Sequence, residues 1–138
     1  MSDSTGNRTD YVQYRLEKAA ETYHAAQILY DAECWNSVIN RLYYACFYAA
    51  SALLIHNDLS AKTHAGVIGK FSEHFVKNNI VDIDEFRVYA KLLTWRTKGD
   101  YNDLYDFNKE DVTPMLAPTK HFIDKVKTLI DSNPMKSR

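Results

Sequence analysis

The feature that most limits the fold of this chain is an apolar run from Leu42 to Ile55, in which Ser51 is the one residue that is neither apolar, aromatic nor small. A helix of this composition has no polar face and belongs inside a bundle or a membrane. At about 1.5 Å per residue the run extends roughly 21 Å, well short of the ~30 Å hydrocarbon layer of a bilayer. The run therefore predicts a central helix that other helices cover on several sides.

Apolar spacing along the rest of the chain predicts the covering helices. In a chain of 138 residues, four glycines and three prolines are few, which favours long helices over a turn-rich β fold. The spacing and the capping residues indicate helices over about residues 9–33, 36–57, 63–76, 82–96 and 111–130. The sequence thus predicts one all-α domain over residues 9–131, an up-and-down four-helix bundle with an additional fifth helix. Residues 1–8 are predicted to be a disordered N-terminus and residues 132–138 a polar tail.

Capping and helix-breaking residues give more local predictions. Ser60 or Thr63 is expected to cap the third helix, because a side-chain oxygen there can accept from a free backbone N–H. Gly66 and Gly69 are expected to permit the close approach of a neighbour. Pro118 is expected to kink the last helix or to delay its start, because proline removes a donor and clashes with the preceding turn.

Charge and cysteine content set limits on partners and compartment. The net charge of −1 gives no global basic field for non-specific binding of nucleic acid. Cys34 and Cys46 form neither a disulfide framework nor a metal-binding spacing, and Cys46 is interpreted as a packing residue. The N-terminus lacks the apolar segment of a secretory signal. We therefore expect a cytoplasmic protein with no membrane partner.

The strongest candidate site is the segment RTKGDY, which contains Arg96, Asp100 and Tyr101. Arg96 and Asp100 are four residues apart, so a continuing helix places both on one face. A guanidinium pairs with a carboxylate or, bidentately, with a phosphate. Two interpretations stay open: an internal Arg–Asp network that fixes the packing of the bundle, or a site for a phosphate or an RNA backbone.

Two further segments belong to the same hypothesis. Arg41 precedes the apolar run and, by helical spacing, shares a face with Tyr44 and Tyr48. An arginine beside so apolar a segment requires a carboxylate or a phosphate, because an unpaired charge there is very costly. His64 follows Thr63 at a predicted helix start, where an exposed imidazole can reach a partner.

A metal site is not predicted. Glu21 and His24 have the spacing used in di-iron bundles, but that chemistry needs a second such pair and two further inward carboxylates. The sequence contains no second pair, so no metal or cofactor is expected. The remaining charged and imidazole side chains of these helices are interpreted as solvated surface, among them Arg15, His56, His74 and His121.

Four segments in order resemble the HEPN domain family: RLEKAAETYHAAQILYDAECW, SVINRLYYACFYAASALL, KTHAGVIGKFSEHFV and RTKGDY. Together they cover about residues 12–130. The resemblance implies a four- or five-helix bundle that dimerises through the helices carrying the motif. Many HEPN proteins are metal-independent ribonucleases of prokaryotic toxin–antitoxin systems, with an arginine, four to six residues and a histidine in the dimer cleft. Others bind RNA, nucleotides or partner proteins, and many are encoded with a minimal nucleotidyltransferase that acts as antitoxin.

One departure from the family pattern bears on function. Arg96 matches the motif arginine, but Tyr101 stands where the nuclease histidine would be. Tyrosine, with a pKa of about 10, is a poorer general base at neutral pH than histidine, with a pKa of about 6.5. The resemblance therefore implies a dimeric module, paired with a minimal nucleotidyltransferase, that binds RNA, a nucleotide or a partner protein. The site residues it implies are Arg41, Tyr44, His64, Arg96, Asp100 and Tyr101.

Two alternatives stay open. One is a divergent metal-independent ribonuclease toxin, in which Arg96 stabilises the scissile phosphate and Tyr101 or His64 replaces the missing histidine. The other is a purely structural subunit that accompanies a nucleotidyltransferase. The sequence leaves open whether the protein is an enzyme.

Overall fold

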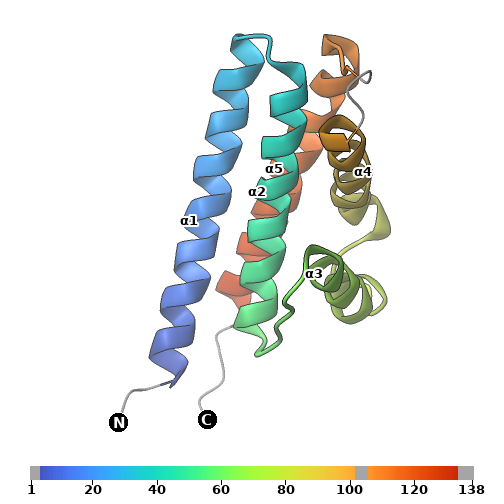
Figure 1. Ribbon diagram of the computed structural model, residues 1–138. Coiled ribbons are helices and arrows are strands. Elements are labelled where there is room, and N and C mark those ends of the chain that lie inside the picture. Colours follow the sequence, from blue (N-terminus) through green and yellow to red (C-terminus); the bar gives the residue numbers. More distant parts are fainter. Residues whose placement is uncertain (1–3, 102–105, 134–138) are drawn as a thin grey trace.

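The computed structural model of the protein describes the backbone of residues 4–101 and 106–133, and over these ranges it contains helices and no β-strand. In chain order the elements are α1 (Ser4–Asp31), α2 (Trp35–His56), α3 (His64–Phe71), the π-helical turn η1 (Ser72–Val76), α4 (Ile83–Tyr101) and α5 (Lys109–Ser132). Figure 1 shows α1 and α2 side by side as a hairpin, with α5 behind them and α3 and α4 on the side of α2 away from α1. The predicted all-α bundle with an additional fifth helix is confirmed.

α2 is the core helix of the bundle, because each of α1, α3, α4 and α5 packs against it. By length and composition alone α2 could cross a membrane, but 67% of its most apolar window is buried inside the structure. The predicted apolar run supplies these buried positions, including Leu42, Tyr43, Cys46, Ala49, Ala50 and Leu53. The run thus packs on several sides as the sequence indicates.

α1 packs on α2 along the predicted seam. Val12, Ala19 and Ala26 are buried, and small alanine side chains let the two helices approach closely. The start of α1 differs from the prediction, because Ser4 and the residues up to position 8 are helical rather than disordered. Arg8 Nη1 lies 3.2 Å from a carboxylate oxygen of Asp58 in the turn after α2, which anchors the first turns of α1. Residues 1–3 and residues 134–138 of the predicted tail lie outside the described residues, and Ser132, the first residue of that predicted tail, is the last residue of α5 (Lys109–Ser132).

One of the two residues predicted to cap α3 does so. The Thr63 side chain accepts from the backbone N–H of Gly66 at 2.9 Å, so Thr63, rather than Ser60, is the N-cap. A Cβ at Gly66 would lie 3.0 Å from Thr63 Oγ1, so this glycine makes room for the cap. The expectation for Gly69 is wrong, because a Cβ there would meet no atom within 4 Å. The cap fixes His64 as the first residue of α3.

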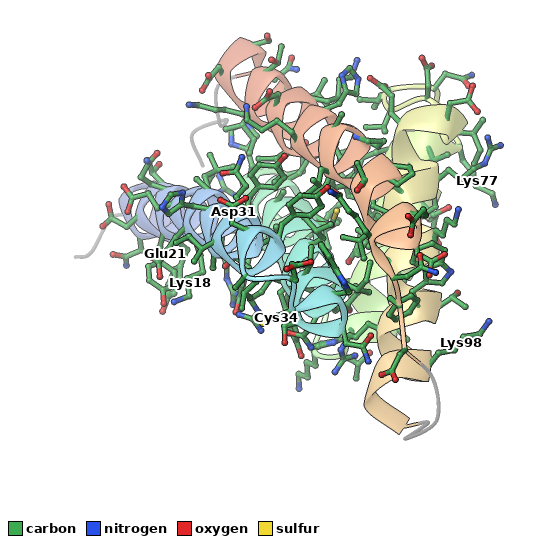
Figure 2. The ribbon with its side chains drawn as sticks, turned by 90° about the horizontal axis from the view of Figure 1, so that it is seen from above. Lys18, Glu21, Asp31, Cys34, Lys77 and Lys98 are labelled. Atoms are coloured by element: carbon green, nitrogen blue, oxygen red, sulfur yellow. The ribbon has the colours of Figure 1, made fainter. Side chains whose placement is uncertain are left out.

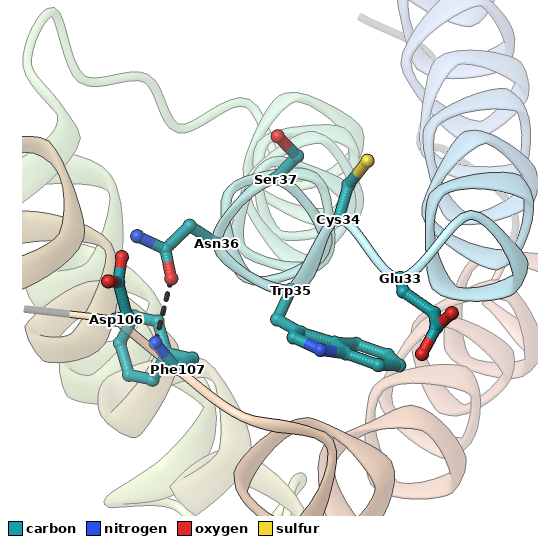
Figure 3. A pocket seen from close by; sticks show the side chains of 7 residues that line it. All are labelled: Glu33, Cys34, Trp35, Asn36, Ser37, Asp106 and Phe107. Atoms are coloured by element: carbon teal, nitrogen blue, oxygen red, sulfur yellow. Dashed lines mark hydrogen bonds between the residues drawn. The ribbon is translucent and has the colours of Figure 1, made fainter.

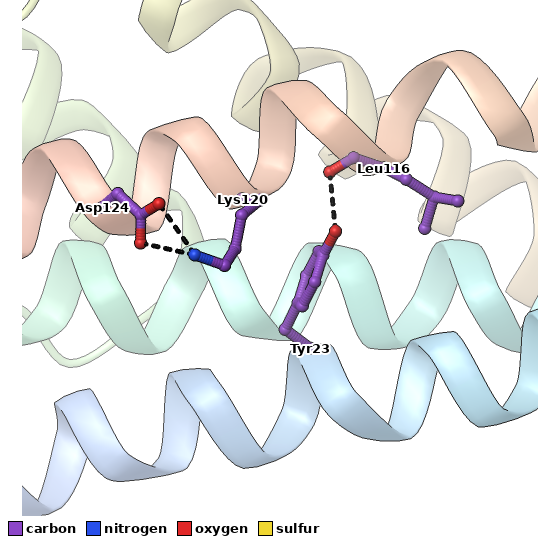
Figure 4. Close-up of polar contacts among 4 residues, drawn as sticks. All are labelled: Tyr23, Leu116, Lys120 and Asp124. Atoms are coloured by element: carbon purple, nitrogen blue, oxygen red, sulfur yellow. Dashed lines mark hydrogen bonds and ion pairs between the residues drawn. The ribbon is translucent and has the colours of Figure 1, made fainter.

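α5 starts earlier than predicted. Asn108 and Asp111 form a capping box, which begins the helix at Lys109 and places Pro114 and Pro118 inside it. Pro118 therefore does not delay the start of the helix. Side-chain hydroxyls bond carbonyls near the prolines: Thr119 Oγ1 donates to Met115 O at 2.7 Å, and the Tyr23 hydroxyl of α1 donates to Leu116 O at 3.1 Å (Figure 4).

Several charged side chains of α1 and of the opposite side of the bundle lie on its outside. Figure 2 shows Lys18, Glu21 and Asp31 of α1, and Lys77 and Lys98 on the opposite side, pointing away from the helices. Cys34 lies exposed at the turn between α1 and α2, whereas Cys46 is fully buried, as predicted.

Candidate functional site

Two arginines from different helices lie against one tyrosine ring. The Cζ atoms of Arg41 from α2 and Arg96 from α4 lie 5.1 Å and 5.2 Å from the centre of the Tyr44 ring. Arg96 Cζ also lies 5.1 Å from the centre of the Tyr43 ring. These distances are within the range of cation–π attraction. The predicted pair Arg41 and Tyr44 is thus joined by Arg96, from a helix that is distant in sequence.

His64 completes the group from α3. Its ring centre lies 4.5 Å from that of Phe47 and 5.6 Å from that of Tyr44, and its Nδ1 lies 3.1 Å from the Tyr43 hydroxyl. Burial and the charge of Arg96 both lower the pKa of His64. His64 is therefore neutral at neutral pH. We call Arg41, Tyr43, Tyr44, Phe47, His64 and Arg96 the Arg–Tyr cluster.

Tyr43 was predicted only as a core residue, and the structure gives it a place in the site. Burial raises its pKa to about 12, although Arg96 opposes that change. The Tyr43 hydroxyl thus keeps its proton at neutral pH. The sequence gives a partial signal for this role, because a tyrosine buried in an apolar helix needs a hydrogen-bond partner.

The polar partner of Arg41 differs from the prediction. Arg41 Nε and Nη2 donate to Asn40 Oδ1 at 3.1 Å and 2.7 Å. No carboxylate within the described part of the chain pairs with this guanidinium, so an amide and an aromatic ring hold it without neutralising its charge. The side chains of Asp100 and Tyr101 lie outside the described residues. The helical backbone of α4 includes both positions, so Gly99 does not end the helix.

Arg15 extends the cluster along α2, which the sequence interpretation missed. Its Cζ lies 5.7 Å from the centre of the Tyr48 ring, and that ring centre lies 6.1 Å from that of Tyr44. Arg15 is partly buried, so its assignment to the solvated surface is wrong. Its buried Nε has no hydrogen-bond partner among the described residues. The signal was present, because Arg15 precedes the buried Thr22 by seven residues, two helical turns, on one side of the seam.

The histidines interpreted as surface residues differ in their exposure. His56 is buried and its Nε2 contacts the carbonyl oxygen of Asn133, so its assignment to the surface is wrong. His121 is exposed and its Nε2 lies 2.6 Å from Glu85 Oε2, which ties α5 to α4. The described residues contain no group of three or more histidine, cysteine, aspartate or glutamate side chains that could hold a metal ion.

Two hollows lie away from the Arg–Tyr cluster. One, of about 340 Å³, lies at the turn between α1 and α2, where Asn36 Oδ1 accepts from the backbone N–H of Phe107 at 2.8 Å (Figure 3). This bond fastens the segment before α5 to the start of α2. The other, of about 440 Å³, lies between α1 and α5, with Leu16, Tyr23 and Ile123 among its apolar residues. Neither hollow contains a residue that the sequence assigns to the site.

The fold and the cluster together define an all-helical domain in which two arginines and a histidine meet on the tyrosines of a core helix. The family model of the HEPN domain matches residues 12–129. The chain belongs to the HEPN domain family, which confirms the resemblance.

Relatives and a solved structure agree with this assignment. The chain is 34% identical over 120 residues to a "UPF0332 protein" of Thermotoga maritima, covering 87% of this chain and 91% of the relative. It is 31% identical over 122 residues to a "Putative toxin" of Methanocaldococcus jannaschii, covering 88% of this chain and 83% of the relative. The crystal structure of TT1696 from Thermus thermophilus superposes with a TM-score of 0.73 at 14% identity, over 85% of this chain and 96% of that one. This last similarity concerns the fold alone.

Proposed function

We propose that the Arg–Tyr cluster binds the phosphate backbone of RNA, as the binding site of a toxin–antitoxin protein that acts in the cytoplasm. The observation that carries the proposal is the meeting of Arg41 and Arg96 on the ring of Tyr44. The two positive charges repel each other, and a phosphate bound beside them is attracted to both. The partly exposed rings of Tyr44 and Tyr48 add surfaces on which unpaired bases can stack.

The relatives support the toxin part of the proposal. A chain of Methanocaldococcus jannaschii that is similar over most of its length carries the name "Putative toxin", and so does a second one from the same organism, 32% identical over 116 residues. We propose that this chain is paired with a minimal nucleotidyltransferase as antitoxin, as the family resemblance implies. Co-purification of the chain with the product of a neighbouring nucleotidyltransferase gene tests this pairing, and a chain that purifies alone from such co-expression contradicts it.

We further propose that the protein is a homodimer. Tyr11, Tyr14 and Ile28 of α1 are 63%, 56% and 56% exposed, and exposed large apolar side chains are typical of an interface. Light scattering at tens of micromolar concentration is expected to give twice the 16.0 kDa of the chain. A monomer mass under these conditions contradicts the dimer.

Binding of a short single-stranded RNA tests the proposal directly. Arg41→Gln and Arg96→Gln should each weaken binding about tenfold or more, because each removes a charged donor to phosphate. Arg87→Gln is the matched control, since Arg87 also lies on α4 but is exposed and paired with Asp84 at 2.8 Å. The dependence of affinity on salt should also become less steep in both cluster variants. Equal affinities for all three variants would exclude the cluster as the RNA site.

The second candidate function is a metal-independent ribonuclease, which the position of His64 favours. Its imidazole is neutral and lies close enough to Arg96 for that charge to lower its pKa. A neutral imidazole beside a guanidinium has the groups needed to accept a proton while the arginine stabilises a phosphate. Cleavage of RNA in the presence of a chelator, lost in His64→Gln while binding persists, would establish this activity. Binding without cleavage in the wild-type protein would rule it out.

A further inference from the structure

The hydrogen bond between Tyr43 and His64 restricts which nitrogen of the His64 ring carries a proton. The Tyr43 hydroxyl comes from the middle of α2 and its residue is fully buried, whereas His64 begins α3 and is partly exposed. The hydroxyl and Nδ1 are 3.1 Å apart. Among the described residues the Tyr43 hydroxyl has no other hydrogen-bond partner. The proton between the two groups therefore belongs to one of two arrangements.

These arrangements differ in the number of hydrogen bonds that they satisfy. If Nδ1 carries the proton and donates, the hydroxyl accepts, and its own proton is left buried without an acceptor in the described structure. If the hydroxyl donates to an unprotonated Nδ1, both groups are satisfied. A buried donor that loses its hydrogen bond disfavours the first arrangement by about fivefold to a hundredfold.

The charges around His64 disfavour the doubly protonated ring at neutral pH. Among the described side chains, the titratable and charged groups that face it are Tyr43 and Tyr44 from α2 and Arg96 from α4. The tyrosines are neutral and Arg96 is positive, so each added proton meets repulsion and no compensating carboxylate among the described side chains. The free N–H groups at the start of α3 add a partial positive charge.

We propose that Tyr43 is a positioning residue that holds His64 as the tautomer protonated on Nε2. The Nε2 atom is on the edge of the ring away from Nδ1, and it has no partner among the described residues. His64 therefore presents an N–H donor, and no basic nitrogen, to a ligand. The part of this inference that concerns the ligand rests on the proposed function: the donor would bond a phosphate oxygen beside Arg96. The inference opposes the second candidate function, in which His64 accepts a proton, because the nitrogen that faces a ligand already carries one.

The tautomer can be measured without a ligand. In long-range ¹H–¹⁵N NMR spectra of the wild-type protein at neutral pH, Nε2 of His64 should have the chemical shift of a protonated nitrogen, and Nδ1 that of an unprotonated one. Tyr43→Phe removes the hydroxyl and keeps the ring, so the two shifts should move toward each other as the tautomers exchange. Tyr89→Phe is the matched control, because Tyr89 is also buried but its hydroxyl has no hydrogen-bond partner among the described residues. A proton on Nδ1 in the wild type, or unchanged shifts in Tyr43→Phe, would overturn the assignment.

The same variants separate this inference from the proposed function. Tyr43→Phe should bind a short single-stranded RNA about twofold to tenfold more weakly than the wild type, the loss expected for one hydrogen bond that is no longer held in place. Tyr89→Phe should bind as the wild type does. If the wild type binds no RNA, the proposed function fails and the NMR result alone decides the tautomer. If RNA binds and Tyr43→Phe binds equally well, the positioning role fails and the binding site stands.

Discussion

Repulsion between Arg41 and Arg96 is the physical basis of the proposed anion site, and it has a measurable size. Because their Cζ atoms lie 5.1 Å and 5.2 Å from the same ring centre, the two carbons are at most about 10 Å apart. At that separation two unit charges repel by about 0.4 kcal/mol in water and about 1.7 kcal/mol at an effective dielectric constant of 20. Each guanidinium also gains about 0.5–1 kcal/mol from each ring that it contacts. Removing one arginine therefore costs ring contact and relieves repulsion at the same time.

A double-mutant cycle measures the repulsion by itself. Urea unfolding of the wild type, Arg41→Gln, Arg96→Gln and the double variant should show a double loss larger than the sum of the single losses, by about 0.4–1.7 kcal/mol. The reason is that each single variant loses its ring contact and relieves the repulsion. The double variant loses both ring contacts but relieves the same repulsion only once. The excess should shrink at high salt, which screens the pair. Strict additivity, or a double loss smaller than the sum, would refute the claim that the cluster stores repulsion for an anion to relieve.

Three other substitutions test packing and surface electrostatics. Cys46→Ser should lower the free energy of unfolding by about 1–2 kcal/mol, because it buries a more polar group, and it should leave RNA binding unchanged. Tyr89→Phe should leave the stability unchanged or raise it, since its buried hydroxyl has no hydrogen-bond partner within the described part of the chain. The pKa of Glu85 is lowered by its bonds to His121 and the Asp82 backbone N–H, which outweigh burial. Its stabilising effect is therefore present above the ordinary glutamate pKa and lost as the pH falls through the lower folded value. Denaturation curves of Glu85→Gln, measured from neutral pH down to pH values below the ordinary glutamate pKa, should lack that part of the dependence.

Much of the fold could be predicted because it depends on local patterns. The apolar run of α2 and the seam of α1 follow from spacing along one helix. Thr63 caps α3 through a hydrogen bond to a residue three positions further along the chain. The errors at element ends have long-range causes. The start of α1 at Ser4 is accompanied by the contact between Arg8 and Asp58, which are distant in sequence. No local pattern could show that contact.

The candidate site was less predictable for the same reason. Arg41 and Tyr44 are related by helical spacing on α2, so their proximity could be predicted. The approach of His64 to Tyr43 depends on how α3 packs against α2, and the contact of Arg96 with the same ring depends on α4. Arg15 was misassigned because a long polar side chain at the edge of a seam either extends into solvent or folds onto a neighbouring ring. For Arg15 the outcome depends on the Tyr48 ring of α2, which lies beside its guanidinium group.

The choice of a tyrosine ring as a partner of Arg15 and of Arg41 has a consequence for function. A carboxylate would hold a guanidinium in place but would also neutralise it and compete with any incoming phosphate. A tyrosine ring holds Arg15 or Arg41 by cation–π attraction and leaves its charge in place. Burial keeps the Tyr43 hydroxyl protonated, so that residue adds no negative charge beside Arg96 either. The rings thus position the arginines without balancing their charge. In this way a chain with a net charge of −1 can present a local positive site.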